Sequence, residues 1–193
     1  MKRIVLFGDS IMAGYHDGMI SSVLTNRIKN AFPADKVINL SVPGYKTSNA
    51  LTVTKKVVKL KPDICIVGLG ANDISIMDEI KPGKFSANLT YILEEIGHQR
   101  TILLSPPYTN WQKNPDRPWT RQLQFELVTE HLSKEFNVSY VDLLHKMAAQ
   151  PHVDQLLQAD GLHFTGKGYD LLEEMLVPKI KESLIKIKTP VSN

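Results

Sequence analysis

The sequence predicts a three-layer α/β fold, in which helices cover both faces of a parallel sheet. Several apolar runs are too short for helices and are rich in Ile or Val. Segments in which apolar residues recur at helical intervals alternate with these runs along the chain. Nearly continuous apolar strands separated by helices are typical of a parallel sheet buried on both faces, because each crossover must carry the chain back over the sheet.

The apolar runs predict five strands, at residues 4–7, 37–40, 64–67, 102–104 and 138–141. Three helices between them are predicted from apolar residues at three- and four-residue spacings. These residues are Ile20, Val23, Leu24 and Ile28, then Val53, Val57, Val58 and Leu60, and then Leu89, Ile92, Leu93 and Ile96. A further helix is expected over residues 119–136, and residues 168–187 close the chain as a helix despite Pro178.

Length and composition indicate one globular domain. A chain of 193 residues buries roughly 70 % of its unfolded surface, which is enough for a single core. We expect the domain to span residues 1–188, with a C-terminal tail at residues 189–193. The net charge of +3 is small, and the lysines lie mostly on predicted helices that also carry glutamates. The chain lacks a concentrated basic stripe with interleaved aromatic residues, so no nucleic-acid partner is expected.

The compartment is predicted from the cysteine and from the apolar segments. Cys65 is the single cysteine, so it cannot form an internal disulfide, and its apolar run predicts a buried core residue. After Lys2 and Arg3 only residues 4–7 are apolar, which is too short for a secretory signal. No stretch approaches the roughly 20 apolar residues of a membrane span. We therefore expect a cytoplasmic protein without a membrane span, and a homo-oligomer is compatible with the sequence.

Unusual polar and glycine residues occupy three predicted loops. These are Gly8-Asp9-Ser10-Ile11 after the first strand, Gly68-Leu69-Gly70-Ala71-Asn72-Asp73 after the third, and Asp160-Gly161-Leu162-His163 before the last helix. In open parallel sheets, ligands bind beyond the carboxyl ends of the strands. We therefore expect the three loops to converge at one end of the sheet.

Ser10 and His163 have the sequence context of a nucleophile and its base. A serine hydroxyl is a weak nucleophile and needs a neighbouring histidine whose other ring nitrogen is oriented by a carboxylate. Asp160 precedes His163 by three residues, across a turn that can fold the carboxylate towards Nδ1. The alternative is that Ser10 caps a helix, since Asp and Ser are both favoured there. The other histidines are interpreted as ordinary surface or core residues: His16, His98, His131, His145 and His152.

Acyl transfer also needs hydrogen-bond donors for the oxyanion of the tetrahedral intermediate. Asn72 could offer its side-chain amide, and Gly44 could offer a backbone N–H that no side chain obstructs. Each is weak evidence alone, because Gly-Asn and Pro-Gly sequences are also common in ordinary turns.

Together the blocks resemble the SGNH, or GDSL-type, hydrolases, whose name lists their Ser, Gly, Asn and His. They read GDSI at positions 8–11, NLSVPGYKT around Gly44, GAND at 70–73 and DGLH at 160–163. Their order and spacing agree with the family from residue 4 to about residue 169. Ile11 departs from the common Leu, away from the chemistry. The GxSxG elbow of the α/β-hydrolases is absent, so that other esterase family fits worse.

The resemblance implies a flavodoxin-like, five-stranded parallel sheet and a set of catalytic roles. Ser10 would be the nucleophile, His163 the base and Asp160 its orienting acid. The backbone N–H groups of Ser10 and Gly44 and the side chain of Asn72 would bind the oxyanion. The resemblance implies no metal and no organic cofactor.

Two further groups of residues are assigned from their loops. The carboxylates of Asp9 and Asp73 are expected to accept backbone N–H bonds that fix their loops. Pro107, Tyr108 and Trp111 belong to a long loop at residues 106–119, for which we expect either a substrate-pocket wall or simple surface packing.

We therefore expect an ester hydrolase that forms an acyl-serine intermediate, with small or short-chain acyl esters as substrates. Thioesters and O-acetylated sugars use the same machinery and stay open as alternatives. Two rival classes also remain. One is a metal-dependent phosphoesterase with Asp9, Asp73, Asp160 and His163 as ligands. The other is a non-catalytic flavodoxin-like binding module, in which the serine and the acids only cap loops.

Overall fold

The computed structural model describes residues 1–78 and 80–188. Its central sheet has five parallel strands in the order β4-β1-β5-β6-β7. The strands are β1 (Arg3–Gly8), β4 (Lys36–Asn39), β5 (Ile64–Gly68), β6 (Thr101–Leu104) and β7 (Ser139–Val141). In chain order this is the 2-1-3-4-5 arrangement of flavodoxin-like folds, so the predicted fold class is confirmed.

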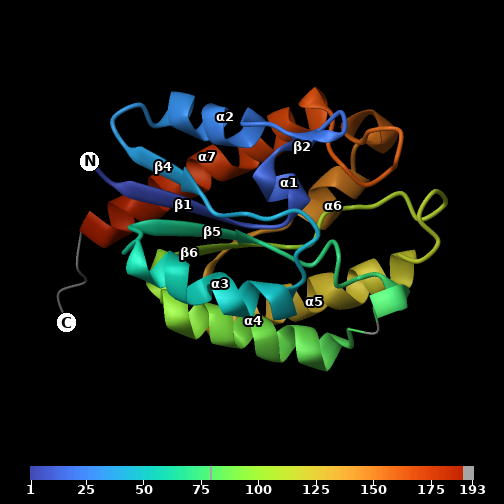
Figure 1. Cartoon of the computed structure of the whole chain (residues 1–193), viewed down its shortest axis with the longest axis horizontal. Helices are drawn as coiled ribbons and strands as arrows, with labels where there is room; N and C mark the ends of the chain where they lie inside the picture. Colours follow the sequence, from blue (N-terminus) through green and yellow to red (C-terminus); the bar gives the residue numbers. More distant parts are fainter. Residues whose placement is uncertain (79, 189–193) are drawn as a thin grey trace.

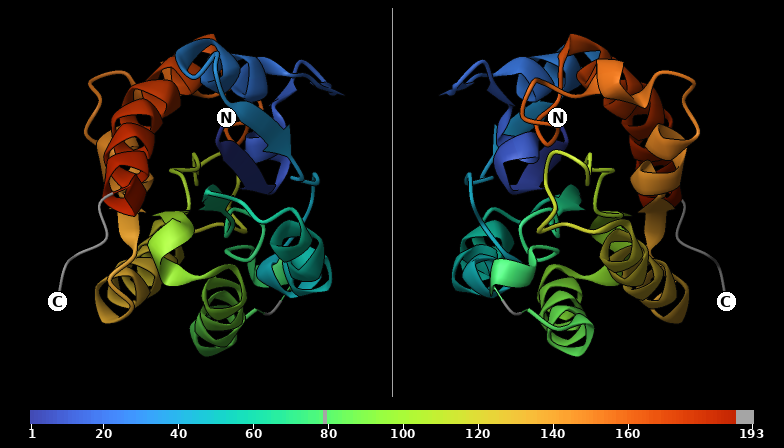
Figure 2. Two further views of the ribbon diagram at one scale, coloured as in Figure 1. Left: turned by 90° about the vertical axis from the view of Figure 1, so that its left-hand side faces the viewer. Right: turned by 90° about the vertical axis from the view of Figure 1, so that its right-hand side faces the viewer.

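Helices cover both faces of the sheet (Figure 1). One face carries α2 (Val23–Ala31) and α7 (Gly166–Lys188), and the other carries α3 (Thr47–Lys59), α4 (Pro82–Ile96) and α5 (Trp119–Glu135). Figure 2 shows the sheet between these two layers. No helix in the described residues is long and apolar enough to cross a bilayer.

The core is divided into two parts by the alternation of side chains along the strands. Ile4 and Leu6 of β1 point into the cluster beneath α2 and α7, whereas Val5 and Phe7 point into the cluster beneath α3, α4 and α5. All four side chains are fully buried. Cys65 is also fully buried, as its apolar run predicts. A sheet covered on both faces needs apolar residues at successive positions, and this need explains the uninterrupted runs in the sequence.

The segment after the first strand differs from the prediction. Ile20 is not part of a helix: it lies in a two-stranded hairpin of β2 (Tyr15–His16) and β3 (Met19–Ile20), and α2 begins only at Val23. The turn residues Asp17 and Gly18 have φ angles of 49° and 78°, and positive φ at both central positions is typical of Asp-Gly hairpin turns. Ile20 is 64 % exposed, so its place in the helical spacing was coincidental.

Several short helices in the connecting segments were not predicted. They are α1 (Ser10–Ala13) after β1 and α6 (Leu143–Ala148) after β7, together with the 3-10 turns Ile76–Asp78, His98–Arg100 and Val153–Leu156. The expected domain of residues 1–188 stays a prediction, and the expected tail at residues 189–193 lies outside the described residues.

Candidate active site

Backbone packing at the end of β1 places Ser10 at the carboxyl end of the sheet, where it is largely buried. Gly8 is required here, because a Cβ at this position would lie 2.1 Å from the carbonyl oxygen of Gly68 in the neighbouring strand. Asp9 then acts as the N-cap of α1, with its carboxylate accepting the N–H of Ile11 at 3.0 Å. Ser10 is therefore the first residue of α1. The close packing of Gly8 against β5 and the N-cap hydrogen bond of Asp9 together fix where this helix begins.

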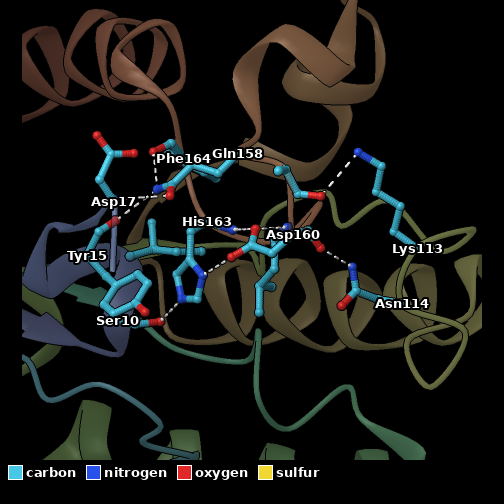
Figure 3. Close-up of polar contacts among 12 residues, drawn as sticks. Ser10, Tyr15, Asp17, Lys113, Asn114, Gln158, Asp160, His163 and Phe164 are labelled. Atoms are coloured by element: carbon cyan, nitrogen blue, oxygen red, sulfur yellow. Dashed lines mark hydrogen bonds and ion pairs between the residues drawn. The ribbon is translucent and has the colours of Figure 1, made fainter. Parts of the chain in front are cut away.

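The side chains of Ser10, His163 and Asp160 form a continuous hydrogen-bonded series, shown in Figure 3. The Oγ of Ser10 lies 2.9 Å from Nε2 of His163. The Nδ1 of the same ring lies 2.6 Å from Oδ2 of Asp160. Ser10 and His163 are 153 residues apart in the sequence, and the fold brings them together at the carboxyl end of the parallel sheet.

The Asp160 carboxylate is held in the orientation that this series needs. Its Oδ1 accepts the backbone N–H groups of Leu162 and His163 at 2.9 and 3.0 Å, so Oδ2 is directed to the imidazole. Burial alone would raise the pKa of the Asp160 carboxyl, but these hydrogen bonds and the contact with His163 hold the pKa below its ordinary value. The group is consequently an anion at neutral pH.

Two residues that sequence reasoning missed support His163. The ring of Tyr15 packs against the imidazole with centroids 4.2 Å apart. The side chain of Gln158 donates to the carbonyl groups of Tyr15 and Phe164, at 3.3 and 2.8 Å, and accepts the N–H of Asp17 at 3.2 Å. Gln158 thereby ties the β2–β3 hairpin to the loop of His163 (Figure 3). No local sequence signal marks these two residues, because the contacts that join the hairpin to the His163 loop are long-range.

The two oxyanion candidates outside Ser10 lie in connected loops. The Nδ2 of Asn72, in the turn after β5, donates to the carbonyl oxygen of Tyr45 at 3.0 Å. Gly44, which directly precedes Tyr45, has a φ of 77°, and a Cβ there would meet no atom within 4 Å. An amide nitrogen carries two N–H groups, so Asn72 can fix this loop and still donate to a second acceptor.

Asp9 and Asp73 are buried, and both accept backbone N–H groups: Asp9 from Ile11 in its own segment, and Asp73 from Thr47 at the start of α3. Both carboxylate oxygens of Asp73 lie 3.0 Å from the N–H of Thr47, and its Oδ1 also accepts the Thr47 hydroxyl at 2.5 Å. Burial raises the pKa of Asp9 to about 7; the hydrogen bond from Ile11 opposes this shift and the charge of Asp73 adds to it. Among the described residues, neither acid belongs to a group of three metal-ligating side chains whose ligand atoms all lie within 4.8 Å of one another.

The loop at residues 106–119 lies against the turn that carries Asp160. The N–H of Asn110 donates to the carbonyl of Gly161 at 2.9 Å, and the side chain of Asn114 donates to the carbonyl of Asp160 at 2.8 Å. Of the three predicted pocket residues, Pro107 is buried, Tyr108 is half-buried and packs near Trp119, and Trp111 is 45 % exposed. The loop therefore supports the Asp160 turn, a role that the sequence did not suggest.

Comparison with known proteins assigns the chain to a family. The model of the GDSL-like Lipase/Acylhydrolase family matches residues 6–171. The chain belongs to this family. It is a carboxylic ester hydrolase, and the predicted resemblance is confirmed. The crystal structure of the lipase/acylhydrolase from Enterococcus faecalis is 39 % identical, with a TM-score of 0.91 over 94 % of this chain and 96 % of that one.

Two yeast proteins are also similar to this member of the GDSL-like family. The isoamyl acetate-hydrolyzing esterase of Saccharomyces cerevisiae is 24 % identical over 210 residues, covering 93 % of this chain and 86 % of the relative. The isoamyl acetate-hydrolyzing esterase of Schizosaccharomyces pombe is 26 % identical over 192 residues, covering 94 % of this chain and 76 % of the relative. The likeness to both spans nearly the whole chain.

Proposed function

We propose that Ser10, His163 and Asp160 form the catalytic triad of this GDSL-like hydrolase. The observation that carries the proposal is the hydrogen-bonded series from Ser10 Oγ through His163 to Asp160, at 2.9 and 2.6 Å. A serine hydroxyl becomes an effective nucleophile when an imidazole of the correct tautomer accepts its proton. Asp160 accepts from Nδ1, and this bond leaves the lone pair of Nε2 directed at Ser10.

The reaction follows from these positions. Ser10 Oγ attacks the ester carbonyl while its proton passes to Nε2 of His163, and the resulting imidazolium is stabilised by Asp160. His163 then returns the proton to the oxygen of the leaving alcohol, whose bond to the acyl carbon breaks. Water then attacks the acyl-serine while His163 accepts its proton. His163 returns the proton to Ser10 Oγ as the carboxylic acid is released. The charged form of Asp160 persists through both steps, because its hydrogen bonds keep the pKa low.

We further propose that the backbone N–H groups of Ser10 and Gly44 and the amide of Asn72 stabilise the oxyanion. The support is their placement in two loops joined by the hydrogen bond from Asn72 to Tyr45. Donors that are already fixed before the reaction stabilise developing charge without reorganisation, which makes them effective in the transition state.

Small or short-chain acyl esters are the proposed substrates. The names of the two yeast relatives specify hydrolysis of an acetate ester, and both likenesses extend over more than nine-tenths of this chain. Acyl-thioesters and O-acetylated sugars remain the alternatives within the same chemistry. A cytoplasmic location and a homo-oligomer stay predictions from the sequence.

Labelling with a serine-directed phosphonate, followed by peptide mass spectrometry, tests the triad. The adduct is expected on Ser10, with loss of hydrolysis of a chromogenic acetate ester, whereas a chelator leaves turnover intact. Ser10→Ala and His163→Ala should each lower kcat by on the order of 10⁴-fold, and the double variant should be hardly worse than either. An adduct on another residue, or additive losses in the double variant, would contradict a triad at these positions.

Comparison of a series of esters tests the substrate class. Acetate to hexanoate esters of one chromogenic alcohol should give kcat/KM values that fall as the acyl chain lengthens. A matched thioester and an O-acetylated sugar serve as the competing substrates. A rise of kcat/KM with chain length, or a clear preference for the thioester or the sugar, would assign the substrate class to one of the alternatives.

A further inference from the structure

A second Asp–His pair lies outside the proposed triad. Asp142 is the N-cap of α6, and its Oδ1 accepts the N–H of His145 at 3.1 Å while its Oδ2 lies 2.9 Å from Nδ1 of the same residue. The pair of Asp160 and His163 has the same arrangement over the same three-residue spacing. From the sequence, His145 is interpreted as an ordinary histidine, and only the structure reveals this likeness.

The third member of this second group is a carboxylate rather than a serine. Oε1 of Glu126, on α5, lies 4.0 Å from Nδ1 of His145 and accepts the hydroxyl of Tyr140 at 2.9 Å. The ligand atoms of Glu126, Asp142 and His145 all lie within 4.8 Å of one another. None of these residues contributes to the triad.

Glu126 is unusual because its carboxylate is buried although, among the described residues, no lysine or arginine side chain pairs with it. Its side chain is 3 % exposed, and Nδ1 of His145 lies 4.0 Å from its Oε1. Burying an anion is costly unless hydrogen bonds or a cation compensate it. Within the described part of the chain the carboxylate receives one hydrogen bond, from the hydroxyl of Tyr140 at 2.9 Å, so its burial is compensated only in part.

We propose that Glu126, Asp142 and His145 bind one divalent transition-metal ion. Two carboxylate oxygens and one imidazole nitrogen suit Zn²⁺ or Mn²⁺, whereas Mg²⁺ and Ca²⁺ favour sites of oxygen atoms alone. Donors at bond lengths of about 2.1 Å around a tetrahedral ion lie about 3.4 Å apart, so the observed separations need only small side-chain rotations.

Binding changes the tautomer of His145 without requiring another reactant. Nδ1 carries the proton in its bond to Asp142, and coordination needs the lone pair of that nitrogen. In a neutral ring the proton moves to Nε2, and the 50 % exposure of the side chain lets water accept this new donor. A groove of about 490 Å³ beside the group, lined by Tyr140, Asp142, Glu174, Lys146 and Lys179, provides the route for the ion and its remaining water ligands.

Calorimetry on the full chain, stripped with a chelator and then dialysed, tests the proposal. Titration with ZnCl₂ should show one equivalent bound, with MgCl₂ at least about tenfold weaker. Glu126→Gln keeps the shape of the side chain and an acceptor for Tyr140, and it should weaken Zn²⁺ binding by about 100-fold or more. His145→Ala changes a half-exposed residue and should have an effect of the same size, so the test remains available if the buried variant misfolds.

Two control variants locate the ion. His131→Ala removes an exposed histidine from the same helix as Glu126, and His163→Ala removes the histidine of the proposed triad. Both should retain Zn²⁺ binding, and thermal unfolding should shift to higher temperature with Zn²⁺ in each. The proposal would be overturned by three results: no saturable binding below millimolar Zn²⁺, unchanged affinity in Glu126→Gln and His145→Ala, or loss of binding in His163→Ala.

Discussion

Replacing Asp160 by asparagine isolates the orienting role of its carboxylate. The Oδ1 atom of Asp160 accepts two backbone N–H bonds, from Leu162 and His163, and Oδ2 accepts Nδ1–H of His163. If the oxygen of the asparagine keeps both backbone bonds, its NH₂ group faces Nδ1. The imidazole must then accept at Nδ1 and carry its proton on Nε2, which points at Ser10. A protonated Nε2 cannot act as the base.

The hydrogen bonds of Asp160 also give the free-energy cost of the other orientation of the side-chain amide in Asp160→Asn. Rotating the amide to restore a bond to Nδ1–H sacrifices both backbone bonds, at 2.9 and 3.0 Å, and places NH₂ against two N–H groups. Each lost bond costs roughly 1–1.5 kcal/mol, so the competent tautomer is disfavoured by about 2–3 kcal/mol, or about 30- to 150-fold. The Asp160 carboxylate also stabilises the imidazolium by its negative charge, and the loss of this charge lowers kcat further. We therefore expect kcat to fall by about 10²- to 10⁴-fold with little change in KM.

Steady-state kinetics with a chromogenic acetate ester, on protein shown by circular dichroism to be folded, measures this effect. Asp35→Asn is the matched control, because Asp35 also accepts a backbone N–H, from Lys2 at 2.8 Å, but lies at the opposite end of the sheet. Wild-type kcat in Asp160→Asn at every pH would refute the orienting role. An equal loss of kcat in Asp35→Asn would instead attribute the effect to stability.

Three further outcomes follow from the site. Asn72→Ala should lower kcat by about 10²- to 10³-fold while KM changes only a few-fold, and a large rise in KM at wild-type kcat would show uniform substrate binding instead. Gln158→Leu should lower kcat and slow phosphonate labelling of Ser10 in parallel, because the β2–β3 hairpin and the His163 loop lose their link; unchanged labelling in folded protein would count against this. The raised pKa of Asp9 means that the native state binds more protons than the unfolded state between pH 4 and about 7. Wild-type stability should therefore fall relative to Asp9→Asn as the pH rises through that window, and urea unfolding at pH 5 and pH 8 that gives a constant difference would exclude the effect.

The fold was largely predictable because its causes are local. A strand buried on both faces needs successive apolar residues, so all five strands appear in the sequence as short apolar runs. The pairing of Asp160 with His163 is also local. The Asp160 carboxylate accepts the backbone N–H of His163, and this hydrogen bond places the carboxylate beside the imidazole of the same residue. The Asp17-Gly18 turn before Ile20 is also a local signal. It predicts a hairpin more strongly than the helical spacing of Ile20 alone predicts a helix.

The sequence by itself determined the layers, the loops that carry chemistry and the pairing of Asp160 with His163. The sequence predicted that Ser10 and His163 act together. Only the tertiary structure revealed that Tyr15 packs against the imidazole, that Gln158 ties the β2–β3 hairpin to the His163 loop, and that Glu126 lies close to Asp142 and His145. The reason is physical. Burial and local hydrogen bonds leave periodic patterns and short motifs in the sequence, whereas the contacts of Tyr15, Gln158 and Glu126 depend on how several elements pack and leave no such signal.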